Sequence, residues 1–262
     1  MPRFAANLSM LFTEVPFLER FAKAREAGFA GVEYLFPYDW PAEQLARELK
    51  AHGLTQVLFN LPPGDWDAGE RGIACLPGRE EEFRAGVEQA IDYARVLGCR
   101  QVNCLAGLKP EGLDSSIARE TLVANVRFAA KRLEEAGVTL CLEAINSRVD
   151  MPGFLLDTSA RVMAVIEEVA AGNVCLQYDI YHMQIMEGDL LRTIERLLPR
   201  IGHIQFADNP GRNEPGTGEI HFPNLFAALD RLGYAGWVSA EYRPAADTEA
   251  SLGWFRTANE PS

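Results

Sequence analysis

The sequence predicts a (β/α)8 barrel, a closed ring of parallel strands surrounded by helices, formed by residues 1–262 as a single domain. Apolar, strand-like runs alternate with amphipathic segments of about ten to twenty residues, the pattern of a parallel sheet with helical crossovers. Eight such units can be counted, and about 250 residues is the usual length of an eight-stranded barrel. The apolar content of 48% is sufficient for its core.

The alternative α/β fold is an open, doubly wound sheet. Such sheets normally carry a glycine-rich phosphate-binding turn after an early strand. The segment NLSML, which follows the first expected strand at residues 4–8, is no such turn. The closed barrel is therefore the preferred interpretation.

Glycine and proline mark the boundaries of the expected elements. The first helix is expected at residues 16–27 and the last at residues 248–258. Six amphipathic segments end at a glycine, which tolerates the left-handed conformation that terminates helices, and a strand follows within a few residues. These glycines are Gly28, Gly53, Gly98, Gly137, Gly172 and Gly233. The seventh strand is instead entered through Pro199, which a helix cannot easily continue past.

An acidic residue interrupts the fifth strand, VTLCLEAIN at residues 138–146. An ionised carboxylate among apolar residues costs several kcal/mol unless a cation or hydrogen-bond donors compensate it, so Glu143 requires a partner. The next three strands carry Asp179, Gln205 and Glu241 near their ends. Because the carboxyl ends of barrel strands meet at the catalytic face, these four side chains could converge on one metal ion. Alternatively, each forms a strand-end ion pair with an Arg or Lys.

These two Glu, one Asp and one Gln form an oxygen-only set of ligands, which suits Mg²⁺ or Mn²⁺. Zinc is less well matched, because no His or Cys occupies these positions. A hard divalent ion beside two carboxylates suits proton transfer at a carbon next to a carbonyl, so Glu143 and Glu241 are the candidate catalytic acid and base. No organic cofactor is expected. A non-catalytic, sugar-binding barrel with structural carboxylates is the alternative.

Two histidines lie near the same strand ends. His182 follows Asp179 by three residues and could polarise a substrate oxygen or act as an acid. A structural hydrogen-bonding role is the alternative for His182. His203 lies two residues before Gln205 on the same face of its strand, where we expect it to pack or to support the site from behind.

Two long loops, at residues 62–77 and 209–221, are rich in Gly, Pro and charged residues. Both follow strands, so both should lie over the catalytic face as lids or binding loops. Arg71 and Arg212 in these loops could bind a substrate carboxylate through two hydrogen bonds each, or be ordinary loop charges. Trp66 could close over the site or simply pack.

Composition limits the partners and the location. A net charge of −12 argues against nucleic acid, whose binding depends on basic contacts to phosphate. No run approaches the roughly 18 apolar residues of a membrane span, and the N-terminus lacks the apolar segment of a signal peptide. The five cysteines form no CxxC pair and are expected to be thiols of a reducing compartment, which indicates a cytoplasmic protein. The expected partner is a small molecule, and a homo-oligomer is left open.

Several long motifs resemble one enzyme family, hydroxypyruvate isomerase, over nearly the whole chain. They are FAANLSMLF, NLPPGDWDAGERGIACLPGREEEFR, LEAIN, QYDIYHMQIMEGD and IGHIQFADNPGRNEPGTGEI. More broadly, the chain is similar to the xylose-isomerase-like barrels, which include ketose 3-epimerases. The resemblance implies interconversion of hydroxypyruvate and tartronate semialdehyde. 2-Oxo-tetronate isomerase, whose substrate is one carbon longer, and ketose 3-epimerase are the alternatives.

The resemblance also implies roles for individual residues. In the epimerases, Glu, Asp, His and Glu on strands five to eight hold the metal, and the two Glu form the acid/base pair. Here these roles fall on Glu143, Asp179 and Glu241, whereas Gln205 occupies the position of the metal-binding His. The DxxH pattern is retained from Asp179, so its His is expected to contact substrate, and the epimerase Arg corresponds to Arg212. Related barrel endonucleases carry three zinc ions and many His, which four His and the acidic charge of this chain do not match.

Overall fold

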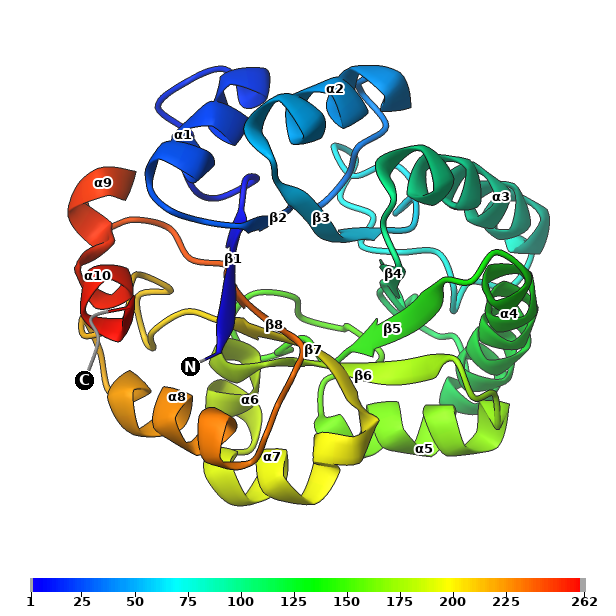
Figure 1. The fold of residues 1–262 in the computed structure, drawn as a ribbon. Helices are drawn as coiled ribbons and strands as arrows, with labels where there is room; N and C mark the ends of the chain where they lie inside the picture. Colours follow the sequence, from blue (N-terminus) through cyan, green and yellow to red (C-terminus); the bar gives the residue numbers. More distant parts are fainter. Residues whose placement is uncertain (1, 260–262) are drawn as a thin grey trace.

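The computed structural model describes residues 2–259 and confirms the closed barrel of parallel strands (Figure 1). Neighbouring strands pair in chain order, and the last pairs with the first, where Phe4 lies opposite Val238. The strands are β1 (Arg3–Asn7), β2 (Gly31–Glu33), β3 (Thr55–Asn60), β4 (Gln101–Cys104), β5 (Thr139–Glu143), β6 (Val174–Asp179), β7 (Ile201–Phe206) and β8 (Trp237–Ala240).

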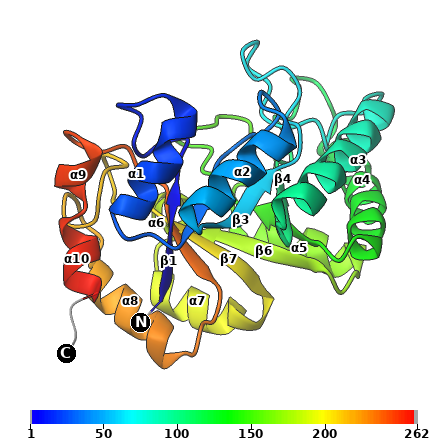
Figure 2. The same cartoon turned by 45° about the horizontal axis from the view of Figure 1, so that its top comes forward.

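Helices surround the strands, as Figures 1 and 2 show. They are α1 (Arg20–Glu26), α2 (Ala42–His52), α3 (Glu80–Leu97), α4 (Ser115–Glu135), α5 (Ser159–Val169), α6 (Ile180–Met186), α7 (Leu190–Leu197), α8 (Phe222–Arg231), α9 (Thr248–Ser251) and α10 (Gly253–Asn259), with 3-10 turns η1 (Phe17–Glu19) and η2 (Leu198–Arg200). Within residues 2–259, no helix has the length and apolarity needed to cross a membrane.

The helix boundaries agree with most of the glycine signals. Gly53 and Gly98 cap α2 and α3 in the left-handed conformation, with φ of 61° and 65°. The prediction for Gly172 is wrong. Helix α5 ends at Val169, and its C-cap residue Ala170 takes the left-handed conformation at φ 55° while its N–H donates to Ile166 O. The left-handed residue that follows this helix is therefore an alanine, two positions before the glycine.

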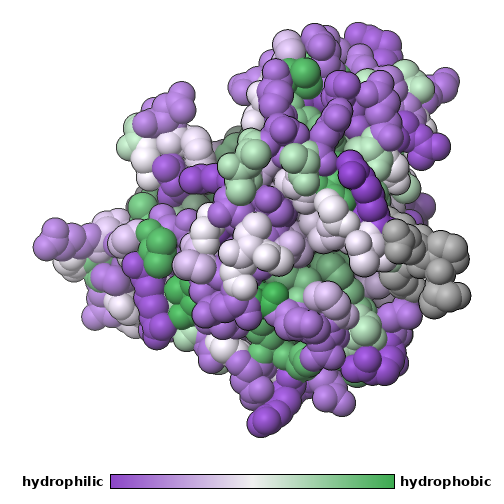
Figure 3. Space-filling model, turned by 90° about the vertical axis from the view of Figure 1, so that its left-hand side faces the viewer, coloured by the Kyte–Doolittle hydropathy of each residue, from purple (hydrophilic) through white to green (hydrophobic). Residues whose placement is uncertain are grey.

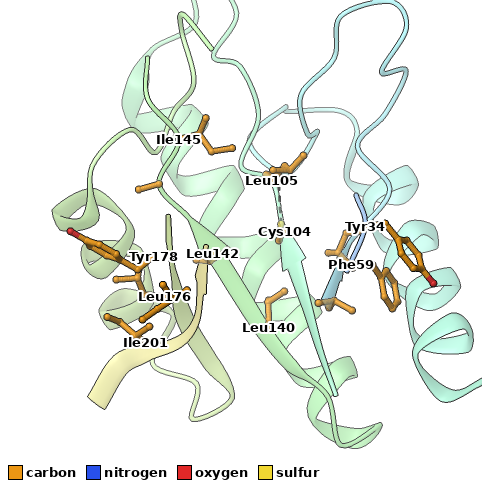
Figure 4. Packing of buried hydrophobic residues seen from close by; sticks show 14 of the residues in the cluster. Tyr34, Phe59, Cys104, Leu105, Leu140, Leu142, Ile145, Leu176, Tyr178 and Ile201 are labelled. Atoms are coloured by element: carbon orange, nitrogen blue, oxygen red, sulfur yellow. Dashed lines mark hydrogen bonds between the residues drawn. The ribbon is translucent and has the colours of Figure 1, made fainter. Parts of the chain in front are cut away.

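Side chains along each strand point alternately outward, into the hydrophobic core under the helices, and inward, into the barrel. On β5, Leu140 and Leu142 pack in the large core cluster under the helices, and Figure 4 shows them with Leu176 of β6. Cys141 points the other way and belongs to a small cluster inside the barrel. Because side chains alternate along a strand, Glu143 follows Cys141 on the inner face. The fold therefore turns the acidic side chain inward.

A separate apolar groove of about 900 Å³ lies on the outside of the barrel between α8 and α10. Phe226 and Trp254 line it, and Figure 3 shows apolar residues between hydrophilic ones on this side of the molecule. The strand ends that carry the polar side chains do not line this groove.

We expect core and surface positions of α4 to respond differently to truncation. Leu122 is fully buried in the core, whereas Ile117 of the same helix is 46% exposed. Leu122→Ala should lower the free energy of unfolding by about 2–5 kcal/mol, because it removes buried methyl groups and leaves a cavity. Ile117→Ala should change it by less than about 0.5 kcal/mol. Urea unfolding measures both, and equal losses would contradict the assigned packing.

Candidate active site

A cavity of about 720 Å³ opens at the carboxyl ends of the barrel strands. Its floor includes Glu143, Glu241 and Gln205, as expected for strand-end residues. Both predicted loops reach it, since Arg71 and Arg212 line its wall. Figure 2 shows the first of these loops, drawn in cyan, rising between β3 and α3. The predicted strand-end residues and both long loops therefore meet around one cavity.

Three of the four predicted metal ligands come together. Asp179 and Glu241 are joined by a side-chain hydrogen bond, and Glu241 continues the pairing of β8 because its N–H donates to Phe206 O. Glu143 and Asp179 present oxygens within 4.8 Å of one another and of a nitrogen of His182. All these side chains are buried. This Glu/Asp/His group could hold a metal ion.

The amide of Gln205 is engaged by other side chains. Its Nε2 donates to Glu33 Oε1 at 2.7 Å, and its Oε1 accepts from Gln177 Nε2 at 2.5 Å. A carbonyl oxygen has a second lone pair, so this arrangement leaves one acceptor position for a cation. Gln205 therefore lines the cavity in an orientation that its hydrogen bonds to Glu33 and Gln177 fix.

Glu33 was not predicted as a site residue, yet it organises the floor of the site. It is fully buried at the end of β2 and accepts hydrogen bonds from Asn7 Nδ2 at 3.0 Å and from Gln205. Its Oε2 lies 2.7 Å from His203 Nε2, and a carboxylate only accepts, so the imidazole donates. His203 Nδ1 then accepts from Gln101 Nε2 at 3.3 Å. The sequence pattern that could have identified Glu33 is the one that identified Glu143, namely an acidic residue at the end of a buried strand.

Asn146 and Asp150 belong to the connection between β5 and α5, which the sequence analysis did not recognise as a functional loop. The Asn146 side chain is fixed because its Oδ1 accepts from the backbone N–H groups of Val149 and Asp150. Its Nδ2 therefore donates to His182 Nδ1, at 2.7 Å. The neutral His182 ring then carries its proton on Nε2, which lies 3.9 Å from Glu143 Oε1. The signal that could have revealed this loop is its length, residues 144–158.

The two loop arginines occupy different environments. The Arg212 side chain is 12% exposed, and its guanidinium lies 3.1 Å from Glu241 Oε2 and 3.4 Å from Asp150 Oδ1. It is therefore not an ordinary loop charge. Arg71 stacks on Trp66 at 4.0 Å from the ring centroid and donates to the backbone oxygens of Trp66 and Glu70. Arg71 is a cation at the wall of the cavity with no carboxylate among these partners.

Burial and repulsion between neighbouring carboxylates are the main causes of the raised pKa values of Glu143 and Glu241. Burial, reinforced by the charges of Glu241 and Asp179, raises the pKa of Glu143 well above its ordinary value. Burial also raises the pKa of Glu241 well above its ordinary value, although Arg212 opposes this shift. Burial and the charge of Arg212 lower the pKa of His182 well below its ordinary value, so this ring is neutral. A bound cation would return the carboxyls to their ionised form, so this donor set suits a divalent metal.

The family model described as xylose isomerase-like TIM barrel matches residues 21–258. The chain belongs to this family. A hydroxypyruvate isomerase of Escherichia coli is 52% identical over 255 residues, which cover 97% of this chain and 98% of that protein. A 2-oxo-tetronate isomerase of Cupriavidus necator is 50% identical and covers 98% of each chain.

Solved structures of similar proteins have the same architecture. A crystal structure from Brucella melitensis, described as an AP endonuclease of family 2, is 50% identical and has a TM-score of 0.96. The match covers 99% of this chain and 100% of that one. A structure of L-ribulose 3-epimerase is 28% identical with a TM-score of 0.77, covering 100% of this chain and 88% of that one.

We expect Glu33→Gln to lower the free energy of unfolding by about 2–4 kcal/mol at pH 7, because the new amide would point a donor at the donor of His203. Burial opposes ionisation of Glu33, but the His203 imidazole and hydrogen bonds from His203 and Gln205 prevail and lower the pKa of Glu33 on folding. The stability that Glu33 contributes is therefore complete above its unfolded pKa of about 4.3 and is lost as the pH falls through the folded value.

Urea unfolding of both proteins at several pH values measures this difference, which should shrink below about pH 4. Glu81→Gln, on the exposed first turn of α3, is the matched control and should leave the unfolding curve unchanged. A pH-independent difference between wild type and Glu33→Gln would contradict the ionised state of Glu33.

Proposed function

We propose that this chain is an isomerase that interconverts hydroxypyruvate and tartronate semialdehyde. The relatives that are about half identical over nearly their full length carry the names of isomerases acting on short 2-oxo acids. The observation that carries the proposal is the placement of two buried glutamates, Glu143 and Glu241, at the floor of one cavity. A 2-oxo-tetronate is the alternative substrate, since the two relatives differ in this respect.

The reaction requires one C–H proton and one O–H proton to move between adjacent carbons. A base removes a proton from C3 of hydroxypyruvate, which gives a planar enediolate, and an acid returns a proton to C2. Glu143 and Glu241 come from β5 and from the end of β8, so they approach the cavity from different sides. We assign them the roles of base and acid. His182 is oriented to donate Nε2–H to a substrate oxygen while the O–H proton moves from O3 to O2.

A divalent metal, Mg²⁺ or Mn²⁺, fits the donor set of this site. Glu143, Asp179 and Glu241 would hold it, with the carbonyl oxygen of Gln205 as a fourth ligand. When bound, such an ion would act as a Lewis acid on substrate oxygens and keep the glutamates ionised. The His182 proton on Nε2 faces the carboxylates, so His182 serves as a donor and not as a ligand in this proposal.

The substrate carboxylate requires a cation in a protein whose net charge is −12. Arg212 is shared between Glu241 and Asp150, which already balance its charge. Arg71, stacked on Trp66 at the wall, keeps donors for an incoming carboxylate. We assign Arg71 to carboxylate binding and Arg212 to the substrate oxygens next to Glu241.

Replacing either glutamate should slow the chemical step while the barrel stays folded. Glu143→Gln and Glu241→Gln should each lower kcat by roughly a hundredfold to ten-thousandfold, the range of general acid–base groups. In D₂O, wild-type turnover of hydroxypyruvate should place deuterium on the carbon next to the carbonyl, and NMR measures it. Glu167→Gln, on the exposed face of α5, is the control and should behave as wild type.

A product free of deuterium would indicate a hydride shift, and neither glutamate would then be the base. Wild-type activity in both glutamine variants would also remove them from the mechanism. Turnover of 2-oxo-tetronate but not of hydroxypyruvate would select the alternative substrate, with the same labelling test applied to that reaction.

Metal removal tests the proposed cofactor. Prolonged chelation should abolish activity and added Mg²⁺ or Mn²⁺ should restore it, because the cation keeps the two glutamates ionised. Asp179→Asn removes one negative ligand and should raise the metal concentration needed for half-maximal activity. Titration of activity with each metal after chelation measures both effects. Full activity in the chelated protein would show that the site works without a metal.

A further inference from the structure

Gln177 of β6 carries a buried carbonyl oxygen with no partner. The side chain is 1% exposed and lines the cavity, and it lies beside Glu143 in the register of β5 and β6. Its Nε2 donates to Gln205, but its Oε1 has no hydrogen-bond partner among residues 2–259. Buried carbonyl oxygens in folded proteins are almost always paired, so this one is expected to find its partner in the cavity.

A chain of hydrogen bonds that starts at a backbone N–H identifies which end of the Gln177 amide is the oxygen. Ser9 N–H donates to Asn7 Oδ1 at 3.0 Å, which identifies the other end of the Asn7 side chain as Nδ2. This Nδ2 donates to Glu33 Oε1 at 3.0 Å and to Glu241 Oε1 at 2.9 Å. Glu33 Oε1 is therefore an acceptor.

The same acceptor orients the next two amides. Glu33 Oε1 can only be approached by a donor, so Gln205 turns its Nε2 towards it, at 2.7 Å. Gln205 Oε1 then faces Gln177 and accepts from Nε2 at 2.5 Å. Rotating the Gln177 amide by half a turn would place two carbonyl oxygens against each other. The chain of hydrogen bonds therefore leaves an acceptor, and not a donor, without a partner on this cavity-lining side chain.

We propose that Gln177 recognises a hydroxyl group of the substrate, and this inference rests on the proposed isomerase function. The carboxylate and the ketone of a 2-oxo acid offer only acceptors, whereas its hydroxyl can donate to Gln177 Oε1. A 2-oxo acid without the hydroxyl would leave the carbonyl unpaired in a buried position. Gln177 is thus a specificity residue that separates hydroxylated 2-oxo acids from their deoxy analogues.

Two inert probes isolate this contact. Tartronate and malonate are dicarboxylates that differ by one hydroxyl, and calorimetry measures the dissociation constant of each without turnover. We expect the wild-type protein, with its metal supplied, to bind tartronate about tenfold more tightly than malonate, as one added hydrogen bond allows. In Gln177→Leu this preference should fall to about twofold or less. Gln177→Met, whose side chain is of similar length and more flexible, should lose the preference for tartronate to the same extent. It replaces Gln177→Leu in the experiment if that variant does not fold.

Gln56→Leu is the matched control. Gln56 is also buried and also carries an unpaired Oε1, but it does not line the cavity. Its replacement should therefore leave the ratio of the two dissociation constants unchanged.

An unchanged ratio in folded Gln177→Leu or Gln177→Met would overturn the proposal, as would a wild-type protein that binds neither probe. Weaker metal binding in these variants with an unchanged ratio would assign the oxygen to the metal and also overturn it. The proposed function fails separately, if wild type converts neither 2-oxo acid while the ratio still depends on Gln177.

Discussion

The site depends on the hydrogen bonds that converge on the carboxylate of Glu33. This side chain joins β1, through Asn7, to β7, through His203 and Gln205. Asn7 extends the network to Glu241, so the position of one proposed catalytic glutamate depends on a residue at the end of β2. A buried carboxylate with several donors is stable only when all of them remain in place, and this requirement makes the floor of the cavity rigid.

The second constraint is the excess of negative charge at the mouth of the barrel. Glu143, Asp179 and Glu241 are buried together, and Arg212 is the cation that contacts the group from within residues 2–259. Burial raises the pKa of all three carboxyls, and the charges of neighbouring carboxylates add to this shift for Glu143 and Glu241, which opposes their action as bases. The proposed divalent ion provides the missing charge. Burial and the charge of Arg212 lower the pKa of His182 and keep its ring neutral, and a neutral ring held by Asn146 is a donor with a defined direction.

The outer wall of the cavity is made by loops, whereas its floor is made by strands. A cavity of about 720 Å³ is larger than a three-carbon acid requires. The volume of the cavity therefore does not by itself select a substrate of three carbons, and Trp66 and Arg71 of the first long loop line its wall. The two relatives that are about half identical to this chain carry the names of isomerases for substrates that differ by one carbon.

The sequence alone determined the fold class, the order of the strands and the face on which the polar strand ends meet, because these follow from local periodicity and from polar residues at strand ends. It also singled out Glu143, Asp179 and Glu241, since acidic residues in apolar runs are conspicuous without any contact information. Only the tertiary structure decided the partners. Glu33 and His203 are 170 positions apart, and no local pattern indicates that they meet. The direction of each amide, and hence the free oxygen of Gln177, follows from a network that spans several strands and exists only in the closed barrel.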